Sequence, residues 1–161
     1  NLILKDYFNK KTKEKFDKYT DTLLYLAARN EHVKNKIRPA LLKKKIVICD
    51  RFTDSTIAYQ VYGKKVEFKL IENVHKYILQ KIKPDITFLL KVKANKASSR
   101  LKKRKTKNRY DKFSKNFYQN AQKAFIKLAK KNKKRYFIFD NSTDDKELEK
   151  KIFNTVLSKL K

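Results

Sequence analysis

The sequence predicts an α/β fold, in which a parallel sheet is flanked by helices within a single domain covering residues 1–161. Short apolar runs alternate along the chain with longer amphipathic segments, as in strand–helix–strand units. Three of these runs, at residues 46–49, 86–92 and 136–139, are too short for helices and suit strands covered on both faces. A chain of 161 residues can bury a core of its own.

The first long amphipathic segment predicts a helix over residues 14–37. Apolar side chains recur there at helical spacing, and Pro39 is expected to end the helix near Arg38. The expected buried stripe consists of Leu23, Leu26, Ala27, Val33 and Ile37. Tyr25 and Arg29 are four residues apart, so they share a helix face beside this stripe.

The next two elements are expected to be a strand at residues 46–50 and a helix at residues 53–62. The strand ends in a charged pair, Asp50 and Arg51, and the helix is predicted to be capped by Thr53 or Asp54. In open α/β sheets, ligands bind at the carboxyl ends of the strands. Because an arginine fork can meet two phosphate oxygens at once, these residues predict an anion and nucleotide site.

The rest of the chain repeats the pattern. Helices are expected over residues 68–82 and 115–130 and near the C-terminus, separated by the strands at 86–92 and 136–139. Ser114 is predicted to cap the second of these helices.

Histidine and cysteine do not predict a metal site. His32 and His75 are assigned to polar helix faces, and neither has Cys, Asp or Glu neighbours at metal-ligand spacing. The single cysteine, Cys49, is interpreted as a small core residue of the first strand.

Three blocks of the chain, in this order, resemble bacterial thymidylate kinases. The first is residues 23–29 (LLYLAAR), which is similar to the helix that binds thymine in that family. The second combines residues 48–52 (ICDRF) and 54–60 (DSTIAYQ) and resembles the family's Asp-Arg-Tyr/Phe block. The third is residues 83–90 (KPDITFLL), which resembles the strand that follows. The likeness runs from Leu2 to the C-terminal helix.

The resemblance implies a P-loop nucleoside-monophosphate-kinase fold and the ATP-dependent phosphorylation of dTMP to dTDP, a step in dTTP synthesis. It also implies Mg²⁺ with the ATP and a homodimer. The cytoplasm is the expected location by default, because the N-terminal residues show no signal-peptide pattern. Arg51 would grip the acceptor phosphate, and Asp50 would orient Arg51 or bind Mg²⁺ through water. Tyr25 would stack on thymine while Arg29 donates to a base carbonyl. Further dTMP contacts are implied for Ser55, Thr56, Tyr59 and Gln60.

Each of these residues also has a plainer structural interpretation. Asp50 and Arg51 can form an exposed ion pair at the end of a strand, and Tyr25 and Arg29 can be a packed tyrosine and a surface arginine. The residues from Ser55 onward can be ordinary members of a helix's first turns.

Residues 94–113 resemble the family's lid, whose arginines neutralise phosphate charge during transfer. The resemblance places Arg100, Arg104 and Arg109 in this catalytic and ATP-binding role. Two departures, Lys105 in place of a glycine and Asn108 in place of an acid, leave a solvated lysine-rich loop as the alternative.

The chain contains one glycine, Gly63, which is also expected to break the helix at residues 53–62. These residues therefore contain no Gly-rich phosphate loop. Family members begin with a strand, that loop and a second strand, whereas this chain begins at Asn1. We expect the first two strands to be missing, and the 161 residues alone to be inactive and unstable.

The formal net charge is +28, from 44 Lys and Arg against 16 Asp and Glu. A basic nucleic-acid-binding module is one alternative that this charge raises. Because the lysines are spread through every segment and form no single stripe, solvated faces are the preferred interpretation and a nucleic-acid partner is not expected. A related kinase of another nucleotide or nucleoside is the other alternative. No apolar run approaches the ~20 residues of a membrane-spanning helix.

Overall fold

The computed structural model describes residues 16–92, 96–97, 99–100, 113–142 and 146–160. These residues belong to two compact units, one within residues 1–83 and 112–125 and the other within residues 84–111 and 126–161. The single domain expected from the chain length stays a prediction.

Helix α2 (Lys18–His32) opens the first unit. Asp17 caps it, because one carboxylate oxygen accepts hydrogen bonds from the N–H groups of Tyr19 and Thr20 at 2.6 and 2.7 Å. The backbone hydrogen bond from Thr20 is the main reason why the pKa of Asp17 lies below its usual value. The predicted start of this helix at residue 14 lies outside the described residues.

The buried side of α2 differs from the predicted stripe at two positions. Leu26 is buried as expected, but Leu23 is 51% exposed and Ala27 is exposed as well. Thr22 takes the core position one turn before Leu26, because its hydroxyl donates to the carbonyl of Lys18 at 2.7 Å and so loses little on burial. The prediction from periodicity was wrong here because it assigned only apolar residues to the buried side of the helix.

The helical run continues through Pro39, which corrects the prediction that it ends near Arg38. A π-helix, η1 (Val33–Ile37), follows α2 directly, and α3 (Arg38–Leu42) follows η1. The N–H of Arg38 donates to the carbonyl of Val33, five residues earlier. This wider turn relieves the clash that a proline ring makes with the carbonyl four residues before it in a regular α-helix.

Residues 46–49 do not form the predicted strand within the described part of the chain. Ile46 is 67% exposed, Ile48 is 95% exposed, and Cys49 is half-buried instead of being a core residue. A strand needs a neighbour to receive its backbone hydrogen bonds. The apolar pattern reports that these side chains favour burial, but it carries no information about whether a partner strand is present.

Helix α4 (Thr53–Thr56) and the π-helix η2 (Ile57–Gly63) form the next helical run. The predicted caps are wrong, because Phe52 is the N-cap and makes no side-chain cap bond, while Thr53 and Asp54 lie inside the first turn. The run does end at Gly63 as predicted. A Cβ at Gly63 would lie 2.8 Å from Cδ2 of Phe117, so packing as well as helix propensity favours glycine there.

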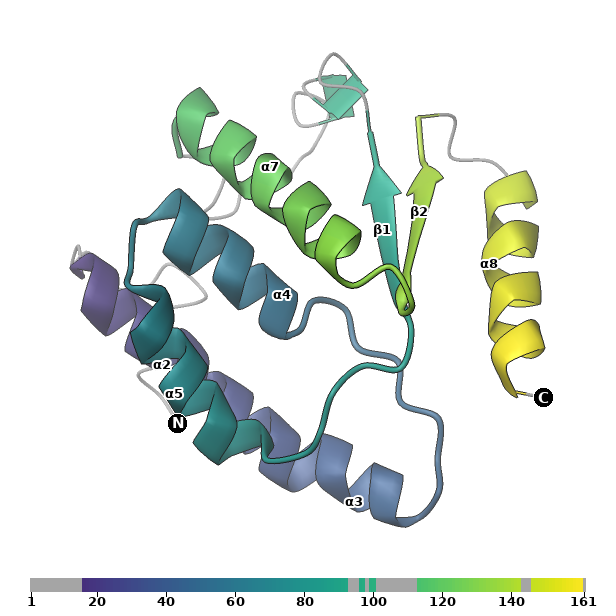
Figure 1. Cartoon of the computed structure of the whole chain (residues 1–161), viewed down its shortest axis with the longest axis horizontal. Helices are drawn as coiled ribbons and strands as arrows, with labels where there is room; N and C mark the ends of the chain where they lie inside the picture. Colours follow the sequence, from purple (N-terminus) through teal and green to yellow (C-terminus); the bar gives the residue numbers. More distant parts are fainter. Residues whose placement is uncertain (1–15, 93–95, 98, 101–112, 143–145, 161) are drawn as a thin grey trace. The chain divides into compact units, whose positions relative to one another are not determined.

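Helices α5 (Phe68–Leu79) and α7 (Lys115–Lys131) confirm two predicted helices. Helix α5 ends three residues before the predicted end, because Gln80 has a left-handed φ of 54°. It packs along α2 (Figure 1). At the start of α7, Oγ of Ser114 accepts a hydrogen bond from the N–H of Phe117 at 3.2 Å, as predicted for a cap.

The second unit contains the predicted parallel strands, β1 (Thr87–Lys91) and β2 (Tyr136–Asp140), paired from Thr87 with Tyr136 to Lys91 with Asp140. Phe88 packs against Phe137 and Phe139, with ring centroids 5.9 and 6.0 Å apart. Helix α8 (Lys146–Leu160) runs beside the pair (Figure 1). Within the segment expected to be the lid, residues 96–97 and 99–100 are helical and most of the others lie outside the described residues.

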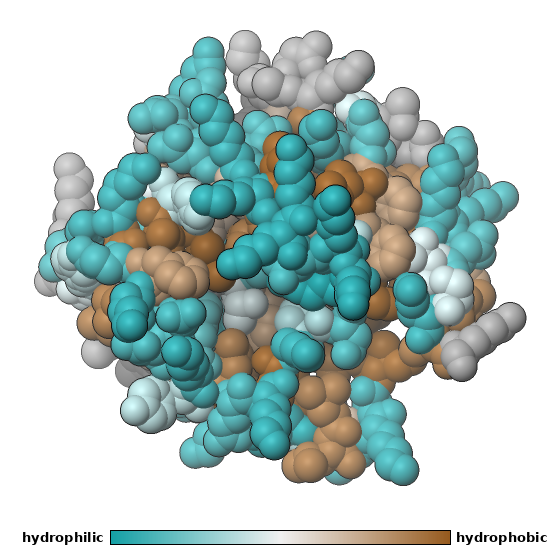
Figure 2. Space-filling model, in the orientation of Figure 1, coloured by the Kyte–Doolittle hydropathy of each residue, from teal (hydrophilic) through white to brown (hydrophobic). Residues whose placement is uncertain are grey.

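Hydrophilic side chains cover much of the face shown in Figure 2, as expected for a chain with a net charge of +28. Apolar side chains are visible between them. Among the described residues, no helix is both long and apolar enough to cross a membrane.

Candidate functional site

The backbone turns sharply at Arg51, which has a φ of 61°. This left-handed conformation is uncommon for a residue with a side chain and costs about 1–2 kcal/mol. The side chain of Arg51 is held as well: Nη1 donates to Oη of Tyr59 at 2.6 Å, and the guanidinium lies 5.2 Å from the centroid of the Tyr59 ring. Strain of this kind persists where the surroundings fix it, and it is concentrated at binding and catalytic sites.

Arg29 holds the backbone at Arg51 in this conformation. Its Nη1 donates to the carbonyl of Arg51 at 3.2 Å, and its Nη2 donates to the carbonyl of Phe52 at 3.1 Å. The same guanidinium lies 4.8 Å from the centroid of the Phe52 ring. Burial lowers the pKa of Arg29, although an arginine remains charged throughout the ordinary pH range. One side chain of α2 therefore clamps the loop that carries Arg51.

Tyr59 is positioned by two phenylalanines of α7. Its ring stacks on Phe117 at 5.8 Å with 10° between the planes, and it meets Phe125 edge-on at 5.7 Å. Tyr59 lies in the π-helix η2, and π turns are frequent at functional sites. The two phenylalanines thus fix the Tyr59 ring, and the Tyr59 hydroxyl group in turn fixes the direction of the Arg51 side chain.

The remaining predicted substrate residues lie on the same two helical runs. Tyr25 is half-buried on α2, one turn before Arg29. Ser55 is half-buried and Thr56 is buried in α4. Gln60 is buried beside the carboxyl group of Asp21. Arg51 therefore contacts both Arg29 and Tyr59, and Tyr25, Ser55 and Thr56 lie on the helical runs that carry these two residues.

An ion pair beneath these elements was not predicted from the sequence. Asp21 is fully buried and pairs with Lys64, which lies 5.2 Å from the centroid of the Phe113 ring. Burial raises the pKa of the Asp21 carboxyl group, while Lys64 and Gln60 act in the opposite direction. The pair ties α2 to the residue after η2. No periodic signal marks a single buried acid on a charged helix, so the sequence offered no means of finding it.

His75 was assigned to a polar surface, and the structure corrects this. It is only 8% exposed, whereas His32 is exposed as predicted. The pKa of His75 is lowered to about 4, mainly by burial and secondly by the positive charge of Arg29, while Asp54 acts in the opposite direction. His75 lies one turn after the buried Ile71 on α5, so the helical spacing was the signal that could have revealed its burial.

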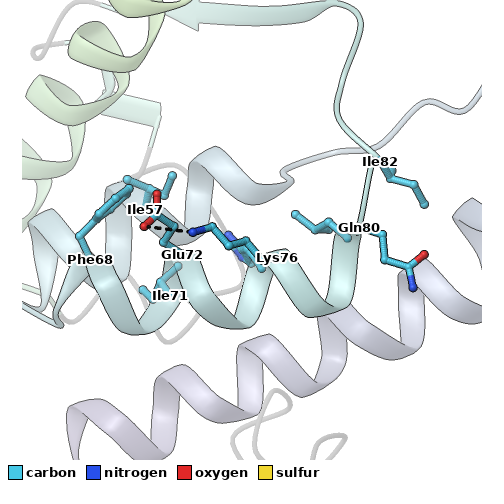
Figure 3. A pocket seen from close by; sticks show the side chains of 9 residues that line it. Ile57, Phe68, Ile71, Glu72, Lys76, Gln80 and Ile82 are labelled. Atoms are coloured by element: carbon cyan, nitrogen blue, oxygen red, sulfur yellow. Dashed lines mark ion pairs between the residues drawn. The ribbon is translucent and has the colours of Figure 1, made fainter.

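A cavity of about 230 Å³ lies against α5 (Figure 3). Its walls are mainly apolar, and Ile57, Ile71 and Ile82 contribute to them. Glu72 and Lys76 line it as an ion pair at 3.8 Å. None of Arg29, Arg51 and Tyr59 lines this cavity, and its apolar walls do not suit a phosphate.

The residues predicted for the metal and the lid are Asp50, Arg100, Arg104 and Arg109. Asp50 is an exposed carboxylate next to Arg51, and the described residues contain no group of three or more His, Cys, Asp or Glu side chains that could hold a metal ion. Arg100 belongs to the second unit, where its Nη2 donates to the carbonyl of Asn141 at 3.0 Å. Arg104 and Arg109 lie outside the described residues.

Comparison with known proteins gives matches over most of the chain. Residues 3–152 match the family model described as thymidylate kinase. A thymidylate kinase of Mycoplasma capricolum is 36% identical over 147 residues, which cover 90% of this chain and 69% of the relative. That of Wolbachia pipientis wMel is 45% identical over 113 residues, covering 70% of this chain and 56% of the relative.

Two further matches cover almost all of the chain. A thymidylate kinase of Onion yellows phytoplasma is 36% identical over 164 residues, covering 100% of this chain and 77% of the relative. The crystal structure of thymidylate kinase from Ehrlichia chaffeensis has a TM-score of 0.72 and 28% identity, covering 96% of this chain and 71% of that one. The chain thus spans between 56% and 77% of the lengths of these relatives.

Proposed function

We propose, since this chain belongs to the thymidylate kinase family, that the protein containing it phosphorylates dTMP to dTDP with ATP as donor. An oxygen of the dTMP 5′-phosphate attacks the γ-phosphorus of ATP in line, and the bond from that phosphorus to the bridging oxygen breaks to release ADP. The protein contributes little covalent chemistry to such a reaction. Its contribution is to position the two nucleotides and to place positive charge around the transferred group.

The contact between Arg29, Arg51 and Tyr59 is the observation that supports this proposal most. Tyr59 Oη accepts from one Nη of Arg51 and so fixes the direction of a planar guanidinium, a group whose geometry matches a phosphate. Arg29 fixes the backbone of Arg51 and Phe52 through hydrogen bonds to their carbonyls. A guanidinium held in this way from both ends suits the acceptor phosphate of dTMP, because little side-chain freedom is lost when the phosphate binds.

The base and sugar would be held by the neighbouring residues. In this proposal, the half-buried ring of Tyr25 stacks on thymine, and Arg29 donates to a base carbonyl. Arg29 can do this while it clamps the loop, because each of its Nη atoms carries a second N–H beyond the one given to a carbonyl. Ser55 and Thr56 would contact the base edge, Tyr59 would face the 2′ carbon of the sugar, and Gln60 would contribute less directly.

The donor side of the reaction is also part of the proposal. Arg100, Arg104 and Arg109 would neutralise the phosphates of ATP from a lid at residues 94–113. Mg²⁺ typically uses one or two carboxylates together with water and substrate phosphates, so the exposed Asp50 fits a water-mediated contact to it. When bound, Mg²⁺ would neutralise phosphate charge. The intact enzyme would be a cytoplasmic homodimer.

A substrate panel tests the proposal on the full-length protein that contains these residues. With ATP and Mg²⁺, ADP release is measured for dTMP, UMP and thymidine as acceptors, and kcat/KM is expected to be at least tenfold higher for dTMP than for either alternative. Equal or higher values for UMP or thymidine would instead identify a kinase of another nucleotide or nucleoside.

Substitution of Arg51 tests the residue that would hold the acceptor phosphate. Arg51→Ala is expected to lower kcat/KM for dTMP by about 100-fold or more, since it removes a charge-assisted contact to the phosphate. Lys36→Ala removes one positive charge at an exposed position of η1 and serves as the matched control. Similar losses in both variants would count against a specific role for Arg51.

A further inference from the structure

Two complementary polar atoms are buried in the first unit without hydrogen-bond partners among the described residues. They are Nε of Arg29 on α2 and Nε2 of His75 on α5. The two helices pack along each other (Figure 1). Buried polar groups in folded proteins nearly always find partners, so each of these atoms needs an explanation.

The chemistry of the two atoms matches. The Nε of a guanidinium is a donor only, whereas a neutral imidazole has one nitrogen that accepts. The His75 ring is kept neutral because it is buried and because the charge of Arg29 disfavours a second positive charge nearby. Both atoms are enclosed, and the helices that carry them pack along each other, so a direct bond between the two side chains would satisfy both.

We propose that His75 is a positioning residue for Arg29. In its Nδ1-protonated tautomer, the ring accepts a hydrogen bond at Nε2 from the Nε–H of Arg29. The other two nitrogens of the same guanidinium hold the carbonyls of Arg51 and Phe52. His75 would thereby fix the plane of the guanidinium, and the guanidinium would fix the loop.

The consequence for function passes through Arg29, because the proposal gives His75 no contact with substrate. Loss of the imidazole would let the Arg29 fork rotate, which weakens the support of the strained backbone at Arg51. dTMP would then bind less tightly, while the transfer step in the occupied site changes less. This effect on dTMP rests on the proposed function, whereas the bond between the two side chains does not.

The test uses the full-length protein labelled with ¹⁵N and saturated with dTMP. NMR is expected to show the His75 ring neutral with its proton on Nδ1, and to show slow solvent exchange of the Arg29 Nε–H. His75→Phe keeps a flat ring but removes the acceptor. It is expected to speed that exchange at least tenfold and to raise KM for dTMP about tenfold, with kcat within about threefold.

Two further variants make the test specific. His75→Gln returns an acceptor oxygen at about the reach of Nε2 and is expected to restore most of the exchange protection and of KM, which a role in packing alone would not do. Tyr77→Phe alters an 84% exposed ring on the same helix and should change neither.

Each outcome decides the proposal. Unchanged exchange of the Arg29 Nε–H in His75→Phe overturns it, and so does a wild-type ring protonated on Nε2, which can be observed even if the variant does not fold. If the exchange depends on His75 but dTMP is not a substrate, the proposed function fails and the role of His75 stands. If dTMP is a substrate and the exchange of the Arg29 Nε–H does not depend on His75, the proposed function stands and the role of His75 fails.

Discussion

Arg29 donates to the backbone carbonyl of Arg51 at 3.2 Å, so the arginine of the predicted base-binding helix holds the arginine of the predicted phosphate-binding loop. The two arginines are 22 positions apart in the sequence. In the proposed site, this contact would couple the binding of the base to the binding of the phosphate. Substitutions at Arg29 should therefore affect both parts of the nucleotide.

Arg29→Lys tests this link. A lysine keeps the positive charge but cannot offer two parallel N–H groups to the carbonyls of Arg51 and Phe52. We expect KM for dTMP to rise about tenfold and the free energy of unfolding to fall by about 1–2 kcal/mol, measured by steady-state kinetics and urea denaturation. Lys36→Arg, at an exposed position of η1, is the control for exchanging the two residue types. Retention of wild-type KM by Arg29→Lys would contradict the clamp.

Tyr59→Phe separates the hydroxyl group from the ring. The variant loses the 2.6 Å hydrogen bond to Arg51 but keeps the ring between Phe117 and Phe125. We expect the free energy of unfolding to change by no more than about 1 kcal/mol while KM for dTMP rises about fivefold, because Arg51 is no longer aimed. The comparison uses Tyr77→Phe, whose ring is exposed. A large loss of stability without a change in KM would show that the hydroxyl serves the fold alone.

Gly63→Ala tests whether packing fixes the end of η2. Alanine normally stabilises a helical position by about 0.5–1 kcal/mol relative to glycine. Here its Cβ would press on the Phe117 ring, which stacks on Phe113 at 4.3 Å and on Tyr59 and cannot easily move. We expect a loss of about 1–3 kcal/mol in the free energy of unfolding.

A second substitution reveals the cause of that loss. In a Phe117→Leu background, the added cost of Gly63→Ala should be smaller, because the aromatic ring that the new methyl group meets is gone. Equal costs in the two backgrounds would point to the backbone instead of Phe117.

His75 should make stability depend on pH. Its folded pKa of about 4 lies below the ordinary value of 6.5, so between these values the unfolded chain binds a proton that the folded chain does not. The free energy of unfolding therefore falls as the pH drops from about 6.5 to about 4, by up to about 3 kcal/mol. The charges around the ring are Arg29 and Asp54, with Glu72 and Lys76 lining the adjacent cavity.

His75→Asn should remove most of that pH dependence. Urea denaturation between pH 7 and pH 4.5 is the measurement, and His32→Asn, at an exposed position, is the control that should keep the wild-type slope. Identical slopes in His75→Asn and the wild-type protein would mean that the imidazole is protonated at its usual pH.

The local sequence pattern was enough to predict the elements whose apolar residues recur at a single helix or strand spacing. The strands β1 and β2, their parallel direction and the cap at Ser114 were predicted from apolar runs and residue type. The family was predicted as well, because three ordered blocks of polar and aromatic residues resembled it and the family comparison bears this out.

The predictions that were wrong depended on contacts between segments distant in sequence. Pro39 continues a helix because a π turn precedes it, and that turn has no signature in the residues themselves. Asp21 is buried because Lys64 reaches it from the end of η2. The strained backbone at Arg51 is held from α2 and η2 together, so reading along the chain could suggest its role but not its conformation.

The uncovered isoleucines at positions 46 and 48 bear on how these residues behave in solution. Unpaired β-branched segments readily add to one another edge to edge, which is the first step of aggregation. The net charge of +28 opposes such encounters only while ions are scarce, since the Debye length shrinks from about 30 Å at 0.01 M salt to about 3 Å at 1 M. Low ionic strength should keep copies apart, and concentrated buffers should bring them out of solution.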